Sequence, residues 1–359
     1  MIDSVGLIEL QRATSGVLHA ASSGSSPDSI LIKRLSALKG SKSGDACFFF
    51  SREYLDDLVE AHPTVLVTSK IFLEGLKSYK HPILNSAWII EVEDPYLALG
   101  LATQLFAGRG FDPSVSSKSA ETRVHKTATV DPSAKLGHGV VIGPNAVIGA
   151  RVVIGDQSEI DANVVLGDEV VVGRDSRLFA GVVIYPRVKI GDETRIHSLT
   201  TIGADGFGYA PIMKNKVPVG HQKIYHLGSV RIGNKVEIGA NSSIDRGTLE
   251  DTVIEDEVKI DNNVQIGHNV LMKRGSVICG SAGMAGSSTL GEFSIIGGLT
   301  GVSNKVVIGN YAKVAAMSIV MKDMKDHEVC AGVPQRSHRD FLKVNAWLNK
   351  NALKGSKES

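Results

Sequence analysis

One histidine stands in a run that otherwise repeats an aliphatic residue every six positions. The run is DNNVQIGHNV, residues 261–270, and its histidine is His268. An imidazole exchanges protons near neutral pH, so His268 is a candidate general base. Asp261 lies earlier in the run and Gly286 lies eighteen residues beyond the histidine. A carboxylate can orient an imidazole and a backbone N–H can bind an oxyanion, so the three residue types together could transfer a proton and stabilise a developing negative charge.

Each of the three also has a simpler interpretation. Most of the 11 histidines are expected at the surface, and aspartate and glycine are common turn residues. The repeat decides where these side chains point. Its aliphatic positions recur every six residues from Val124 to Ile202, and again from Ile232 to Val320 with four extra residues after Ile244. This period fits neither an α-helix nor one long strand, so it predicts short strands joined by turns around a buried aliphatic column.

The repeat resembles that of the left-handed parallel β-helix acyltransferases, whose coils take three hexapeptides each and which assemble as trimers. The resemblance implies that residues eighteen apart lie above one another, with Gly286 over His268. His268 follows two positions after an inward isoleucine, so it is expected outside the core. Polar chemistry is therefore expected in clefts between neighbouring subunits.

The chain has the length of two domains, and its expected fold class is mainly β. We predict an N-terminal α/β domain at 1–107, with strands at 47–50, 64–69 and 87–93 and a helix at 94–106. A linker at 108–123 follows, because this segment is rich in glycine, serine and charge. The left-handed β-helix is expected at 124–334, with an inserted loop at 204–228, and a helical C-terminal extension at 335–359 that caps it.

Composition excludes several classes of protein. The formal net charge of +1 gives no reason to expect nucleic acid as a partner. Three distant cysteines without CxxC spacing argue against a disulfide framework and a zinc site. No apolar run is long enough to cross a membrane, and the N-terminus lacks the pattern of a signal peptide, so the protein is expected in the cytoplasm and not membrane-spanning.

Several segments together resemble one family, the UDP-3-O-acylglucosamine N-acyltransferases of lipid A biosynthesis. They are IHSLTTIGADGFGYA at 196–210, HQKIYHLGSVRIG at 221–233, ANSSIDRGTLEDTVI at 240–254 and IDNNVQIGHNV at 260–270. The resemblance covers nearly the whole chain. It implies transfer of a 3-hydroxyacyl group from acyl carrier protein to the 2-amino group of a UDP-3-O-acylglucosamine, giving a UDP-2,3-diacylglucosamine.

The same resemblance implies roles for residues. His268 is then the general base, Asp261 orients it, and the Gly286 N–H stabilises the oxyanion. No metal or other cofactor is implied, because the phosphopantetheine arrives on the carrier protein. The implied partners are two further copies of the chain in a homotrimer, the acyl carrier protein and the UDP-acylglucosamine.

The resemblance also implies binding residues. In CFFFSREYLDDL, Phe48 and Tyr54 align with two aromatics that stack on uracil, and Ser51 stands where the family usually has asparagine. Without the resemblance, these aromatics would be interpreted as domain core. The further substrate contacts are Asn262, Gln265 and Lys305, the last standing where relatives have histidine. Contacts with the acyl chain or its carrier are Asn269, Ile319, Met321 and Lys322.

Three alternatives stay open. An O-acyltransferase acting on UDP-N-acetylglucosamine would share the β-helix but lack both the N-terminal domain and the DGFGYA loop. A hexapeptide-repeat protein that only binds a sugar nucleotide would leave the set of Asp261, His268 and Gly286 unexplained. A metal-dependent hydratase predicts histidines clustered at ligand spacing, which the repeat region does not contain.

Overall fold

The computed structural model describes residues 4–20, 26–107 and 121–355. The chain forms two compact units, Met1–Lys118 and Ser119–Ser359. Most of the predicted linker, 108–120, lies outside the described residues. The predicted fold class, mainly β with a left-handed parallel β-helix, is confirmed.

The first unit is an α/β domain around a five-stranded sheet. Its strands, in spatial order, are β2 (Val17–His19), β7 (Trp88–Val92), β6 (Val65–Ser69), β5 (Asp45–Phe49) and β4 (Arg34–Leu35). All neighbours are parallel except β2 and β7. The helices are α1 (Leu7–Ala13), α2 (Leu55–Val59), α3 (Lys70–Ser78), α4 (Ile83–Ser86) and α5 (Pro95–Ala107).

Two apolar clusters place these helices on opposite faces of the sheet. Leu7 and Leu10 of α1 pack with Ala102 of α5 in one cluster, and Leu58, Leu73 and Ile83 of α2, α3 and α4 belong to the other. Short elements complete the unit. They are β1 (Val5–Gly6), its antiparallel partner β3 (Leu31–Ile32), and the 3-10 turns at Pro27–Ser29 and Arg52–Tyr54.

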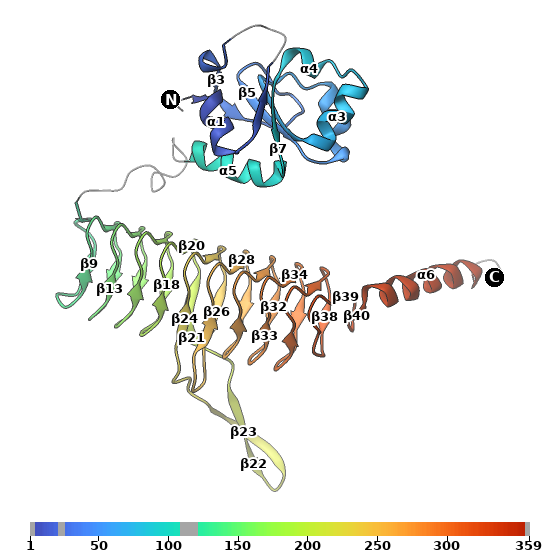
Figure 1. Ribbon diagram of the computed structural model, residues 1–359. Coiled ribbons are helices and arrows are strands. Elements are labelled where there is room, and N and C mark those ends of the chain that lie inside the picture. Colours follow the sequence, from blue (N-terminus) through green and yellow to red (C-terminus); the bar gives the residue numbers. More distant parts are fainter. Residues whose placement is uncertain (1–3, 21–25, 108–120, 356–359) are drawn as a thin grey trace. The chain divides into compact units, whose positions relative to one another are not determined.

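The second unit is a triangular β-helix of stacked coils (Figure 1). It has three faces, and each face is a sheet of parallel strands. Face 1 contains β8 (Arg123–Val124), β11 (Val141–Ile142), β14 (Glu159–Ile160), β17 (Arg177–Leu178), β20 (Arg195–Ile196), β25 (Glu237–Ile238), β28 (Lys259–Ile260), β31 (Val277–Ile278), β34 (Ile295–Ile296), β37 (Lys313–Val314), β39 (Val329–Ala331) and the antiparallel β40 (Arg336–Ser337).

Face 2 contains β9 (Thr129–Val130), β12 (Val147–Ile148), β15 (Val165–Leu166), β18 (Val183–Ile184), β21 (Thr201–Asp205), β26 (Ser243–Arg246), β29 (Gln265–Ile266), β32 (Gly283–Met284), β35 (Gly301–Val302) and β38 (Ile319–Val320). Face 3 contains β10 (Lys135–Leu136), β13 (Val153–Ile154), β16 (Val171–Val172), β19 (Lys189–Ile190), β24 (Val230–Ile232), β27 (Thr252–Ile254), β30 (Leu271–Met272), β33 (Thr289–Leu290) and β36 (Val307–Ile308).

The six-residue period and the strand geometry agree. In most coils each face contributes two residues, of which the first points outward and the second, such as Ile148 or Leu166, is buried in a continuous core. Val147 pairs with Val165, eighteen residues further on, so three hexapeptides make one coil. Burial of the aliphatic column removes apolar surface from water at every step and drives the stacking.

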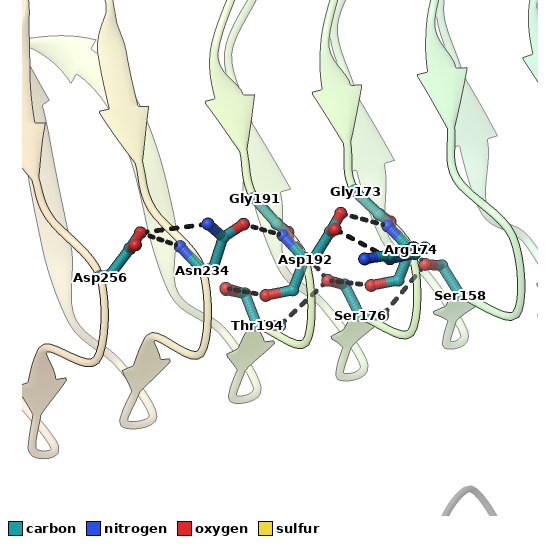
Figure 2. A network of polar contacts seen from close by, with 9 residues as sticks. All are labelled: Ser158, Gly173, Arg174, Ser176, Gly191, Asp192, Thr194, Asn234 and Asp256. Atoms are coloured by element: carbon teal, nitrogen blue, oxygen red, sulfur yellow. Dashed lines mark hydrogen bonds and ion pairs between the residues drawn. The ribbon is translucent and has the colours of Figure 1, made fainter.

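Side chains at the corners tie each coil to the next (Figure 2). The Arg174 N–H donates to Asp192 Oδ1 at 3.0 Å, the Asp192 N–H to Asn234 Oδ1 at 2.8 Å, and the Asn234 N–H to Asp256 Oδ1 at 2.7 Å. A parallel ladder runs through hydroxyls, since Thr194 N–H donates to Ser176 Oγ. These bonds satisfy backbone groups that the turns would otherwise leave unpaired.

An insertion and an extension depart from the regular coils. The insertion forms the antiparallel hairpin of β22 (Tyr209–Lys214) and β23 (Val217–Lys223), which projects from the β-helix (Figure 1). The stack continues across it, because Ile202 of β21 pairs with Ile244 of β26. Helix α6 (His338–Gly355) follows the last coil, where an extension was expected at 335–359. No helix in the described part of the chain is long and apolar enough to cross a membrane.

Candidate active site

A recess opens on face 2 at the base of the hairpin. Its walls come from three consecutive coils and from the inserted loop, which contributes Asp205, Gly206, Phe207, Tyr209 and Lys223. The coils contribute Asp245, then Gln265 and His268, and then Met284 to Gly286. His268 is placed there because it follows Ile266, whose side chain is fully buried, and the chain then turns the corner. Its own side chain is half-buried.

Gly286 lies directly against the ring of His268. A Cβ added at Gly286 would lie 2.5 Å from Nε2 and 2.6 Å from Cε1 of the histidine, so glycine makes room for the imidazole. At the equivalent corner two coils below the inserted loop, Asp168 caps the Ala150 N–H with its side chain. Gly286 has no side chain that could play this part. Among the described residues the Gly286 N–H has no acceptor, so it is available to a bound ligand.

Asn269 orients the imidazole. The Thr248 N–H donates to Asn269 Oδ1 at 3.0 Å, so this oxygen is an acceptor, and His268 Nδ1 lies 3.1 Å from it. The Asn269 amide also donates to the Glu250 carbonyl at 3.0 Å. Nδ1 of His268 is therefore the protonated nitrogen, and Nε2, beside Gly286, keeps its lone pair. This is the tautomer that a general base needs.

Asp261 is not the partner of this ring. Its Oδ2 accepts from the Gly280 N–H at 2.8 Å, and its Oδ1 accepts from the Asn262 N–H at 2.7 Å. It follows a strand of face 1, one corner away from His268, and lines a separate hollow with Asn262, His197 and Lys259. The predicted contact between Asp261 and His268 is thus absent within the described chain, because neighbouring residues in sequence occupy different corners.

Two carboxyl groups, Asp205 and Asp245, line the His268 recess, and Asp245 belongs to the β-helix itself. Burial raises its pKa above the ordinary value, while a hydrogen bond from Gln265 and the nearby His268 and His226 favour the charged form. Asp205 stands on the facing loop, and its ion pair with Lys223, 2.7 Å long, holds the pKa of Asp205 below the usual range. Neither aspartate was among the predicted site residues. Their spacing from His268 follows no repeat, so only the DGFGYA and IDRG motifs marked them.

The predicted uridine contacts lie in the first unit. Phe48 packs in the domain core and is 6% exposed, so it presents no free ring face. Tyr54 is exposed and lies edge-to-face against Phe50, which also contacts Tyr96 in the same way. Ser51 caps the turn that follows β5, with its Oγ accepting from the Glu53 N–H at 3.3 Å. Phe50, Tyr54 and Tyr96 are the aromatic group that the structure brings together.

The remaining predicted contacts lie further along the helix axis. Lys305 is exposed at a corner with a φ of 62°, and its N–H donates to the Gly286 carbonyl at 3.1 Å. Ile319 and Met321 are exposed, and Met321 is tied to Gln335. Lys322 is exposed and its carbonyl accepts from the same glutamine.

Within the described residues the structure contains neither a cluster of potential metal ligands nor a disulfide. No group of three or more potential ligands lies together within residues 4–20, 26–107 and 121–355. All three cysteines are free.

Comparison with known proteins identifies the fold and the family. A family model described as the GMPPB C-terminal domain matches residues 120–206. The structure of an Arabidopsis UDP-N-acetylglucosamine acyltransferase, 23% identical, superposes with a TM-score of 0.52 over 58% of this chain and 71% of that one, which shows a shared fold.

Proteins related in sequence identify the family. The UDP-3-O-acylglucosamine N-acyltransferase of Rhizobium meliloti is 39% identical over 312 residues, which is 87% of this chain and 84% of that protein. The protein of the same name from Helicobacter hepaticus is 34% identical over 306 residues and 85% of each chain. The chain belongs to the UDP-3-O-acylglucosamine N-acyltransferase family.

Proposed function

We propose that this protein transfers a 3-hydroxyacyl group from the thioester of acyl carrier protein to the 2-amino group of UDP-3-O-acylglucosamine, in lipid A biosynthesis and in the cytoplasm. The product is a UDP-2,3-diacylglucosamine. The proposal includes no metal or redox cofactor, because the phosphopantetheine thiol belongs to the carrier.

The reaction follows from the groups in the recess. The nitrogen of the substrate amine attacks the thioester carbonyl while His268 Nε2 accepts a proton from that amine. The Gly286 N–H donates to the resulting oxyanion. When the tetrahedral intermediate collapses, the C–S bond breaks, the amide remains, and the imidazolium returns its proton to the departing thiolate. The observation that carries the proposal is the pairing of His268 with Asn269, which leaves Nε2 unprotonated beside Gly286.

A homotrimer is supported by the outer surface of face 2. Its outward residues form a row without charge through ten coils. They are Thr129, Val147, Val165, Val183, Thr201, Ser243, Gln265, Gly283, Gly301 and Ile319. The outward rows of faces 1 and 3 contain several lysine and arginine residues. An exposed row without charge is typical of a surface that packs against another copy, and closed symmetry around an axis parallel to the helix would place equal coils at equal height.

The proposed trimer also explains how Asp261 and Asn262, which lie away from His268 within one chain, can contact the substrate. Asp261 and Asn262 belong to the coil that leads to His268, but they lie around the corner from it. In the proposed trimer their contact with substrate is made in the recess of a neighbouring subunit.

The acyl chain has a path along face 2. Gly283 and Gly301 leave the outward row without side chains beyond Gln265, and Ile319 closes it one strand later. Three strand spacings of about 4.8 Å make this strip roughly 14 Å long. Ile319 and Met321 then limit the length of the bound chain, and Lys322 contacts the acidic carrier protein.

Mass spectrometry tests the proposal. Purified protein is incubated with UDP-3-O-acylglucosamine and a panel of 3-hydroxyacyl carrier proteins of different chain lengths. We expect one added acyl group, held as an amide that resists mild base. An ester product, or acylation of UDP-N-acetylglucosamine instead, would identify the O-acyltransferase alternative. A folded trimer without turnover on any carrier would favour the sugar-nucleotide binder.

A further inference from the structure

The hairpin of β22 and β23 is a regular structure with a fixed base. Its two strands form a two-stranded sheet of their own. Asn215 and Lys216 at the tip have φ values of 50° and 65°, the left-handed conformation that a tight two-residue hairpin turn requires. At the base Lys223 lies opposite Tyr209 and pairs with Asp205 at 2.7 Å. The hairpin therefore leaves the β-helix in a defined direction (Figure 1).

The side chains along the hairpin are apolar where they are exposed. Ile212, Met213, Val217 and Val219 are between 47% and 60% exposed. A two-stranded hairpin is only marginally stable in water, and exposed apolar groups that lie together mark an interaction surface. The hairpin therefore calls for a surface that covers these side chains.

The charge of the hairpin favours an acidic partner surface. Residues 206–228 contain three lysines, Lys214, Lys216 and Lys223, and neither aspartate nor glutamate. Because Lys223 is paired with Asp205 at the base, the positive charge of the tip comes from Lys214 and Lys216. The partner surface should therefore have an apolar floor and acidic groups about one hairpin length away from the base.

Face 1 of the β-helix has an apolar floor at the height of the hairpin. The hollow lined by Asp261 extends over four consecutive coils, from β20 to β31, and the hairpin is inserted in the coil that begins with β20. The outward row of face 1 is charged at Glu237 and Lys259 and becomes apolar at Val277 and Ile295. Val277 lines the hollow, so part of its floor is apolar.

The acidic groups lie at the far edge of the same face. Glu255, Asp256 and Glu257 follow one another at the corner between β27 and β28. Asp256 accepts from the Asn234 N–H (Figure 2), and Glu257 pairs with Arg274 at 3.0 Å. A carboxylate has about four acceptor sites in total, so both side chains can accept from a further donor.

The length of the hairpin matches the width of one face. The step from Ile260 to Ile266 shows that a face takes six residues from one strand to the next, and β22 and β23 have six and seven residues. At about 3.3 Å per residue an arm of this length reaches roughly 20 Å. A hairpin that starts at one corner of a face therefore brings its tip to the other corner.

The proposed trimer brings the two surfaces together. The hairpin leaves the β-helix at the corner between faces 2 and 3, where His268 also lies, and Asp261 lies at the corner between faces 1 and 2. In the trimer Asp261 of one subunit contacts substrate in the His268 recess of the next. The hairpin beside that recess then extends over face 1 of the subunit that provides Asp261, because face 2 is turned toward the symmetry axis.

We propose that the hairpin docks across face 1 of the neighbouring subunit, with its apolar side chains on the floor of the hollow and Lys214 and Lys216 at residues 255–257. This inference rests on the homotrimer of the proposed function. The hairpin then closes the active site from outside, because Asp261 and Asn262 line the hollow that it covers.

Zero-length cross-linking of mixed trimers tests the inference. Unlabelled and ¹⁵N-labelled proteins are dissociated, mixed, reassembled and treated with a carbodiimide, which joins lysine to a carboxylate. We expect a cross-link between Lys214 or Lys216 and residues 255–257 in which one peptide is light and the other is heavy. The control is Lys214→Arg with Lys216→Arg, which keeps the charge but should lose the cross-link. A wild-type trimer without this mixed cross-link overturns the inference.

Sedimentation gives a second readout. Val219→Asp places a carboxylate against the apolar floor, so the concentration at which the trimer dissociates should rise at least about tenfold. The matched control is Ile71→Asp, which alters an exposed apolar residue of α3 in the first unit and should leave the trimer unchanged. Equal dissociation of the wild type and both folded variants contradicts the proposed docking.

Acyl carrier protein is another occupant that the charge of the hairpin fits. Cross-links from Lys214 and Lys216 to added carrier protein, in place of a neighbouring subunit, overturn the inference. A trimer that shows the mixed cross-link but never acylates UDP-3-O-acylglucosamine contradicts the proposed function alone. An active trimer without the cross-link contradicts the docking of the hairpin alone.

Discussion

The variant Gly286→Ala is expected to displace the imidazole of His268 while it keeps the backbone N–H that donates to the oxyanion. The added methyl group would lie 2.5 Å from Nε2 of the imidazole, whereas ordinary contact between such atoms begins near about 3.5 Å. The ring must therefore move by about 1 Å, since Asn269 holds its other side. Alanine keeps the backbone N–H, so the oxyanion donor remains. A misplacement of about 1 Å costs a catalytic group about a hundredfold in rate.

The assay is kcat at saturating UDP-3-O-acylglucosamine and acyl carrier protein. The expected result is a loss of about a hundredfold with little change in thermal stability. Gly75→Ala is the control, because open space surrounds that glycine in α3 and alanine is compatible with a helix. Turnover within about twofold of the wild type in a folded Gly286→Ala trimer would refute the proposed geometry of the recess.

Three further outcomes follow from other contacts. In Asn269→Ala the Thr248 N–H and His268 Nδ1 lose their acceptor, so kcat should fall at least about tenfold and the free energy of unfolding by about 1–3 kcal/mol. A variant that keeps the wild-type kcat and stability contradicts this. The Arg34 hydrogen bond lowers the pKa of Asp45, so its contribution to the stability of the folded protein is full above about pH 4 and is lost as pH falls through the folded-state pKa. Asp45→Asn should therefore lower Tm at pH 7, and the Tm values of variant and wild type should converge in acid. A Tm difference that stays constant with pH contradicts this. Burial raises the pKa of the Cys47 and Cys330 thiols to about 11, so a maleimide at pH 8 should label the less buried Cys279 first, as peptide mapping would show.

The six-residue period predicted short strands and turns around an aliphatic column, and the resemblance to the hexapeptide-repeat acyltransferases added three hexapeptides per coil. Short-range geometry explains this success, since every coil repeats the same inward and outward positions. The same period correctly places the glycine of the next coil against His268, because stacking depends only on a separation of eighteen residues. The functional role of that contact stays a prediction.

The other walls of the recess follow no period. Asp205 and His226 belong to the insertion, and Asp245 follows the register shift between β21 and β26, so no spacing rule relates them to His268. Asp261 is close to the histidine in sequence, but corner geometry sends its carboxylate to Gly280. Within one chain the recess of His268 receives Asp245 and not Asp261, which depends on tertiary structure, so the catalytic role of Asp261 stays a prediction.

The most direct test of the account is the kcat of His268→Ala for N-acylation of UDP-3-O-acylglucosamine, measured on a folded trimer with the best carrier from the panel. Loss of a general base should reduce kcat at least about a hundredfold while substrate binding persists. Near-normal turnover in this variant would contradict the assignment of His268 as the base.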